Sequence, residues 1–262
     1  TKTAPDGGTW SWSSTDSGIL EIISGADTAT PTIKVRKAGS AQLTVTYTSD
    51  TYYGSANVTF TVVPKEVTAA MIADIAAQEY AAKAIEPTPE VKDGTVTLVS
   101  GTDFDYSYLG NTNAGTATLT ITGKGNYTGT ASKEFTISPK SINGATVKLD
   151  AESFAYTGSE QTVSIASVKL DGWSEEITYK TVSGNKATDA GTVTLTVEGT
   201  GNYTGTATTT WEITKIDPTL ADFDVTGLTT ETYDGTAKTV AVTAKTGIRG
   251  MGDVTVKYNG ST

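Results

Sequence analysis

The sequence predicts an all-β protein built from tandem, small β-sandwich repeats of about 76 residues. The heptapeptide GNYTGTA occurs at residues 125–131 and again at 201–207, 76 positions later. An Ala-Gly-Thr or Ala-Gly-Ser tripeptide recurs with the same spacing at residues 38–40, 114–116 and 190–192. Apolar and polar side chains alternate after each tripeptide, as they do in a strand with one buried and one solvated face. Repetition at a fixed period indicates an array of similar units.

Each repeat is predicted to contain a pair of strands after its Ala-Gly tripeptide, with apolar side chains on one face. Threonine occupies much of the opposite face, where it favours a strand. We expect the buried positions to be Leu43, Val45, Tyr47, Val58, Phe60 and Val62 in the first copy, Ala117, Leu119, Ile121, Ala131, Phe135 and Ile137 in the second, and Val193, Leu195, Val197, Ala207, Trp211 and Ile213 in the third.

The repeated heptapeptide is predicted to form the corner between these two strands. Its glycines and asparagine allow backbone conformations that other residues avoid. We expect the tyrosine ring of each copy to fold back over the edge of the sandwich, which is a structural role.

The repeat period divides the chain into four predicted domains: residues 1–64, 65–139, 140–214 and 215–262. The first is expected to lack the first two strands of a unit, and the last is expected to lack the final hairpin. Residues 156–163 match residues 233–240, and Tyr80 begins a diverged copy of the same element. Residues 69–85 have helical propensity, but their repeat equivalents resemble strands, so we predict β structure there.

The composition excludes several classes of function. The net charge is −10, which disfavours nucleic acid, whose phosphates require a basic surface. The chain contains no cysteine and no histidine, so disulfides, thiolate chemistry and imidazole-based catalysis are absent. No apolar run approaches the roughly 18 residues that a membrane helix needs. We therefore predict no enzyme activity, no cofactor, no metal site and no membrane insertion in this segment.

Residues 65–262 resemble the MBG-type repeats, immunoglobulin-like modules of large surface proteins of Gram-positive gut bacteria. The resemblance is carried by residues 102–106 (TDFDY), 111–116 (NTNAGT) and 123–129 (GKGNYTG). Residues 1–64 resemble part of a bacterial immunoglobulin-like (Big) domain through residues 10–16 (WSWSSTD) and 37–41 (KAGSA). The resemblance implies tandem immunoglobulin-like β-sandwiches, located outside the cell at the bacterial surface or cell wall.

Trp173 is the candidate ligand-binding residue, because it lies in a predicted loop beside acidic residues. Loops on a rigid sandwich are where binding usually occurs. Trp211 is predicted to be core, since it aligns with Phe135 and Phe60. Trp10 and Trp12 share one side of a predicted strand, and we expect one of them to be core.

Two pairs of closely spaced carboxylates, Asp103 with Asp105 and Asp222 with Asp224, could suggest calcium binding. No loop with enough ligands accompanies either pair. We therefore predict that both pairs are solvated acidic edges.

The predicted function is that of a stalk or spacer, which projects another domain from the cell. The first alternative is an adhesin, whose Trp173 loop binds a glycan or a host surface protein. The second is a subunit of a head-to-tail filament, in which the C-terminal part of one chain completes the N-terminal part of the next. Neighbouring repeats of the same chain are the other expected partners.

Overall fold

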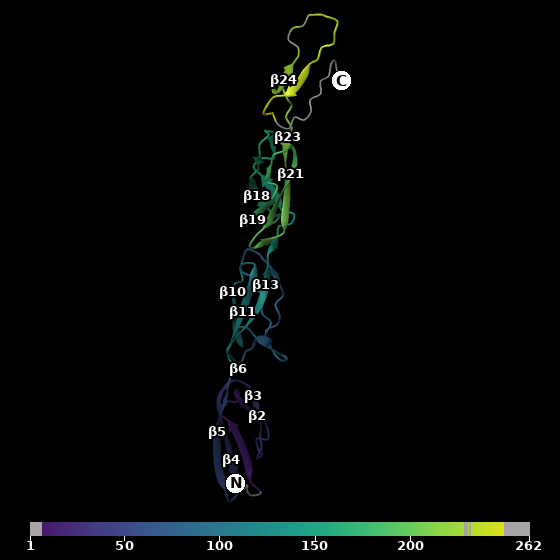
Figure 1. Cartoon of the computed structure of the whole chain (residues 1–262). Helices are drawn as coiled ribbons and strands as arrows, with labels where there is room; N and C mark the ends of the chain where they lie inside the picture. The colour runs from purple at the N-terminus through teal and green to yellow at the C-terminus, as the bar shows by residue number, and fades with distance from the viewer. Residues whose placement is uncertain (1–6, 228–229, 231, 249–262) are drawn as a thin grey trace. The chain divides into compact units, whose positions relative to one another are not determined.

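A computed structural model describes residues 7–227, 230 and 232–248 of the chain (Figure 1). These residues form two compact units, which divide between Ser138 and Pro139. The described residues contain strands and two three-residue 3-10 helices, η1 (Ala69–Met71) and η2 (Leu220–Asp222), and no α-helix. The predicted all-β class, with tandem immunoglobulin-like β-sandwich repeats, is confirmed. The four predicted domain boundaries stay a prediction.

The N-terminal module, residues 7–64, has a three-stranded antiparallel sheet of order β1-β4-β5 and a separate hairpin, β2-β3. Its strands are β1 (Thr9–Ser14), β2 (Leu20–Ser24), β3 (Thr32–Val35), β4 (Gly39–Thr48) and β5 (Tyr53–Val62). Ile19, Leu20, Ala41 and Leu43 form the core between sheet and hairpin. The alternation along β4 therefore predicts its buried face correctly at Leu43.

The exposure of the outer strand β5 differs from the prediction made from the sequence. Val58 and Phe60 were predicted to be buried, but their exposed fractions are 48% and 42%. The reason is topological, because β5 is an edge strand with β4 on one side and no described residue paired on the other. Neither Trp10 nor Trp12 is fully buried: Trp10 packs against Tyr47, and the Trp12 indole N–H donates to the Thr28 carbonyl.

The first repeat, residues 65–138, has a four-stranded sheet of order β10-β11-β13-β7. Its strands are β6 (Lys65–Glu66), β7 (Gln78–Glu79), β8 (Lys92–Asp93), β9 (Val96–Thr97), β10 (Phe104–Leu109), β11 (Gly115–Gly123), β12 (Tyr127–Thr128) and β13 (Thr130–Ser138). Leu119 and Ile121 of β11 pack with Val67, Ile72 and Val91 in one core cluster. Ala117, Phe135 and Ile137 form a second cluster on the same sheet.

Residues 69–85 adopt the β structure predicted from the repeat only in part. The segment contains η1, an isolated antiparallel bridge from Ile72 to Val91 and the two-residue strand β7, and the rest is irregular. β7 pairs in parallel with the end of β13, through Gln78 opposite Ile137 and Glu79 opposite Ser138. The repeat therefore overrides the helical propensity of this segment.

The second repeat, residues 139–214, reproduces this sheet with the order β16-β23-β21-β19, and β15 and β18 form the opposing layer. Its strands are β14 (Lys140–Ser141), β15 (Thr146–Leu149), β16 (Ser153–Ala155), β17 (Gln161–Thr162), β18 (Ile165–Lys169), β19 (Tyr179–Ser183), β20 (Lys186–Ala187), β21 (Gly191–Gly199), β22 (Tyr203–Thr204) and β23 (Thr206–Thr214). Trp211 is 1% exposed. Its predicted place in the core is confirmed.

The C-terminal segment follows the second repeat and contains η2 and one antiparallel pair, β24 (Phe223–Thr226) with β25 (Ala241–Ala244). This pair corresponds in sequence to β15 and β18 of the second repeat, which begin 77 and 76 residues earlier. Exposed apolar side chains of the described part of this segment include Leu220 in η2, Val225 in β24 and Tyr233 between the two strands.

Candidate functional site

The GNYTG corner holds the first residues of its own repeat. In the first repeat, the Lys65 N–H donates to the Asn126 carbonyl at 2.8 Å, and the Val67 N–H donates to Thr128 at 2.9 Å. The second repeat has the same two bonds, from Lys140 to Asn202 and from Ile142 to Thr204, both at 2.8 Å. The corner strands β12 and β22 are thus paired in parallel with β6 and β14. The heptapeptide therefore joins the start of each repeat to its terminal hairpin.

The tyrosine of each corner folds over the edge of the sandwich, as predicted. Tyr203 is 4% exposed, and its hydroxyl donates to the Glu176 carbonyl at 2.9 Å. Tyr127 is half-buried, and its hydroxyl lies 3.4 Å from an oxygen of Asp93. Burial and then the Asp93 charge raise the pKa of Tyr127 above its usual range. Both rings are therefore packed against their own repeat as structural groups.

Glycine is required in this corner by close backbone contact. A Cβ at Gly123 would lie 2.5 Å from the Thr128 backbone nitrogen, and one at Gly199 would lie 2.8 Å from that of Thr204. Gly125 and Gly201 adopt φ values of 62° and 66°, which L side chains avoid. The repetition of these glycines therefore follows from the geometry of the corner.

The Asn126 side chain contacts the N-terminal module within the first unit. Its Oδ1 accepts a hydrogen bond from the Ala38 N–H at 2.8 Å. A groove of about 450 Å³ lies beside this bond, and its lining includes Lys37, Val63 and Tyr127. The Lys65–Asp93 ion pair, at 2.6 Å, also lines it. Asn126, the second residue of GNYTG, is thus hydrogen-bonded to the Ala-Gly-Ser tripeptide of the preceding module.

Trp173, the candidate ligand-binding residue, lies next to the second corner. Its indole N–H donates to the Tyr203 hydroxyl at 3.1 Å, and the two rings meet edge-on with centroids 6.5 Å apart. The Lys140 ammonium group lies 4.6 Å from the centroid of the indole ring, a cation–π distance. Trp173 is half-buried. A sugar that stacked on the face under Lys140 would have to displace this side chain.

The paired carboxylates make local contacts. Asp103 accepts a hydrogen bond from the Val99 N–H, and Asp105 forms a 3.0 Å ion pair with Lys124. Asp222 accepts hydrogen bonds from the N–H and hydroxyl of Thr219 at the start of η2. These contacts stabilise turns and strand ends, and within the described ranges no group of three or more acidic side chains could hold a metal ion.

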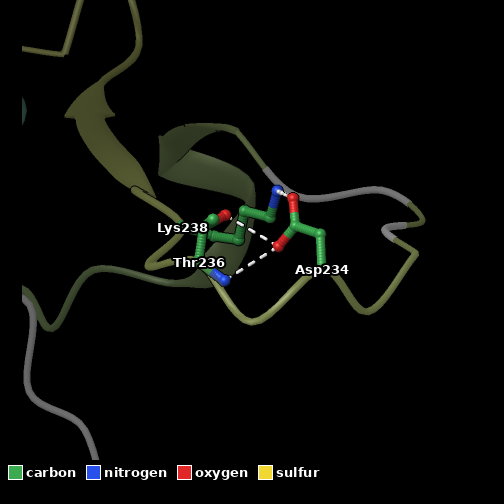
Figure 2. A network of polar contacts seen from close by, with 3 residues as sticks. All are labelled: Asp234, Thr236 and Lys238. Carbon is green, nitrogen blue, oxygen red and sulfur yellow. Dashed lines mark hydrogen bonds and ion pairs between the residues drawn. The ribbon is translucent and has the colours of Figure 1, made fainter.

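A turn in the C-terminal segment carries a network of three side chains (Figure 2). One oxygen of Asp234 accepts hydrogen bonds from the N–H and hydroxyl of Thr236, at 2.9 and 2.7 Å. The other oxygen pairs with the Lys238 ammonium group at 2.7 Å. The hydrogen bond from Lys238, and then those from Thr236, lower the pKa of Asp234 to about 2.

The second repeat contains the same turn with neutral groups. The Thr157 hydroxyl accepts hydrogen bonds from the Ser159 N–H at 3.3 Å and from the Gln161 side chain at 2.6 Å. Thr157, Ser159 and Gln161 precede Asp234, Thr236 and Lys238 by 77 residues. Sequence reasoning aligned the two segments but missed the side-chain network, which the matching polar residues at alternate positions could have indicated.

The second repeat resembles a known family. Residues 145–217 match the family model of the MBG domain. This segment is similar to the MBG domain family. The predicted resemblance to MBG-type repeats is thereby confirmed for the second repeat, in which Trp211 and Tyr203 are buried. MBG domains are extracellular immunoglobulin-like repeat modules, and they are typically not enzymes.

The other comparisons are distant. No curated protein matches the chain. Nine solved chains match it, and one is described as PcdhgB3 EC1-4. That match is 10% identical, covers 79% of this chain and 67% of the other, and has a TM-score of 0.19. A likeness this distant adds nothing to the assignment. No helix in the described part of the chain is long and apolar enough to cross a membrane.

Proposed function

We propose that the chain is a stalk of a bacterial cell-surface or secreted protein, which holds another domain away from the cell wall. The observation that carries this proposal is the position of the two ends of each repeat. The first repeat starts at Lys65, beside the corner that precedes β13, and it ends at Ser138, at the far end of β13. The second repeat starts at Lys140 and ends at Thr214 in the same way.

Each long strand separates the ends of its repeat. β13 and β23 each have nine residues, which span about 30 Å at 3.3 Å per residue. Every repeat therefore holds its preceding and following segments apart by about that length. Since each repeat also has its own core, copies can be added without a new interface for each.

The hydrogen bonds of the four-stranded sheet in the second repeat are also arranged to resist a pulling force on the ends of that repeat. β16 pairs in parallel with β23 through three residue pairs, Ser153–Glu212, Phe154–Ile213 and Ala155–Thr214. A force that pulls the repeat's two ends apart acts along these strands. The bonds across them are then strained together and not one after another, which raises the force needed for unfolding.

Single-molecule force spectroscopy on the whole chain tests the proposal. Each repeat should unfold in a separate event that releases about 250 Å of chain, at about 3.5 Å per residue. Tyr156→Pro removes the N–H that donates to the Thr214 carbonyl at 2.9 Å, so it should lower the unfolding force of the second repeat alone. Repeats that extend without a resolvable force peak would contradict the stalk.

Adhesion through the Trp173 loop is the second candidate. It is supported by the half-buried indole on a loop of a rigid sandwich, next to Lys140 and Tyr203. The ligand would be a glycan or a host surface protein. Binding to insoluble polysaccharides or mucins that the wild-type chain shows and Trp173→Ala loses would establish this role. The control Trp12→Ala, in another module, should bind like the wild type.

A further inference from the structure

The outer edge of β5 differs from the equivalent edges of the two repeats. The register places Phe60 at the position of Phe135 and Trp211, because these residues face Ala41, Ala117 and Val193 on the neighbouring strand. Phe60 is 42% exposed, whereas Phe135 is 4% and Trp211 is 1% exposed. At the end of β5, Val63 is 75% exposed. The described part of the N-terminal module thus presents an apolar strand edge. The equivalent edge of each repeat is covered by another segment of that repeat.

The repeats show what kind of segment covers this edge. In the first, Tyr80 packs against the Phe135 cluster, and its N–H donates to the Ser138 carbonyl at 2.8 Å. In the second, the Tyr156 N–H donates to the Thr214 carbonyl at 2.9 Å, after β16 has paired with β23. The covering segment is therefore a short parallel strand that ends in a tyrosine. Val63 occupies the place of Ser138 and Thr214 as the acceptor.

The C-terminal segment carries a third tyrosine of this type with its ring uncovered. Tyr233 lies 77 residues after Tyr156 and is 95% exposed. The turn that follows it is held by the Asp234, Thr236 and Lys238 network (Figure 2). A segment whose turn is already formed loses less conformational entropy when it binds. The part of the chain that the structure describes therefore has both an acceptor edge with no strand paired to it and a preformed donor turn.

We propose that the β5 edge of one chain accepts the segment around Tyr233 of a second copy as a parallel strand. The Tyr233 N–H of that copy donates to the Val63 carbonyl, and its ring covers Phe60. Strand addition of this kind takes affinity from main-chain hydrogen bonds and specificity from side-chain pockets. Because the acceptor and donor surfaces differ, the contact is heterologous and can continue from copy to copy.

Analytical ultracentrifugation of the whole chain over a range of concentrations tests the contact. The average mass should rise with concentration for the wild type and for Tyr233→Phe, which keeps both the ring and the N–H. Tyr233→Pro removes the N–H and the aromatic ring, so this variant should remain a monomer at every concentration. Tyr233 is almost fully exposed, so neither variant removes a core contact.

Disulfide cross-linking between two differently tagged chains tests the register in which the Tyr233 segment pairs with β5. The chain has no cysteine, so single cysteines can be introduced without competing thiols. By analogy with Ala155 opposite Thr214, Val63→Cys on one chain should form a disulfide with Thr232→Cys on the other. Thr48→Cys, at the other end of the hairpin, is the control and should not cross-link with Thr232→Cys.

A chain that stays monomeric, and in which Val63→Cys cross-links no better than Thr48→Cys, would overturn the inference. A segment other than residues 232–240 would then cover β5. The stalk proposal would be unaffected, since it depends on the force that each repeat resists and not on association between copies.

Discussion

Phe154 and Trp211 meet edge-on in the second repeat, with ring centroids 5.5 Å apart and an angle of 82° between the rings. Phe154 lies on β16, and Trp211 lies on the neighbouring strand β23. The Trp211 indole N–H donates to the Gly184 carbonyl at 2.7 Å. The contact joins β16 to the last strand of the repeat, so the core and the parallel pairing of β16 with β23 depend on the same residues.

Trp211→Ala should therefore destabilise the second repeat by about 3–5 kcal/mol, the usual cost of truncating a buried aromatic residue. Phe60→Ala is the matched variant at the equivalent position. It should cost the N-terminal module no more than about 1 kcal/mol, because the Phe60 ring is already partly solvated. Hydrogen exchange of the β21 and β4 amides measures each module separately. Equal losses of unfolding free energy in the two modules would contradict the conclusion that Phe60 lies on an exposed edge.

Ala82 should be a site where glycine stabilises the first repeat. It is the one non-glycine residue of the described part of the chain with positive φ, 54°. Its equivalents Gly158 and Gly235 have φ values of 71° and 73°. The left-handed conformation costs a side chain about 1–2 kcal/mol, and glycine's extra freedom in the unfolded chain costs about 0.5–1 kcal/mol. Ala82→Gly should therefore stabilise the repeat by about 0.5–1 kcal/mol.

Hydrogen exchange of the β11 amides measures the effect of this substitution. Ala84→Gly is the control, since Ala84 is exposed and lacks positive φ. It should destabilise the same repeat by a few tenths to 1 kcal/mol through the unfolded chain. If both substitutions destabilise the repeat, the αL backbone at Ala82 is not strained.

The repeat period explains why so much of the fold could be predicted. It located the β11–β13 and β21–β23 hairpins and the buried Trp211, and it outweighed the helical composition of residues 69–85. The sequence could not indicate that Phe60 is exposed, because alternation specifies the apolar face of a strand but not whether another strand covers it. It also could not indicate the contact of Lys140 with the Trp173 ring, which depends on the path of the chain through β14 and β22.

The Asp234 turn should respond to acid. The pKa of Asp234 is lowered to about 2, first by the Lys238 hydrogen bond. The folded turn thus favours the carboxylate, so its contribution is fully present above the ordinary pKa of 3.8 and is lost as the pH falls through about 2. Lys238→Met should raise the pKa of Asp234 toward 3.8, as measured by carboxyl carbon chemical shifts. Lys245→Met, the control, should leave this pKa unchanged.

Asn126→Ala should loosen the contact between the N-terminal module and the first repeat. The substitution removes the Oδ1 that accepts the Ala38 N–H at 2.8 Å, and a bond of this kind contributes about 0.5–1.5 kcal/mol. Exchange of the Ala38 amide should then become faster by up to about tenfold, since 1.4 kcal/mol corresponds to a factor of ten. Amides of β13 should keep their protection, because the substitution leaves the main-chain pairing of the corner in place. Asn126→Asp, the control, keeps an acceptor oxygen and should keep the Ala38 amide protected. Unchanged exchange at Ala38 in both variants would show that this bond does not hold the two modules together.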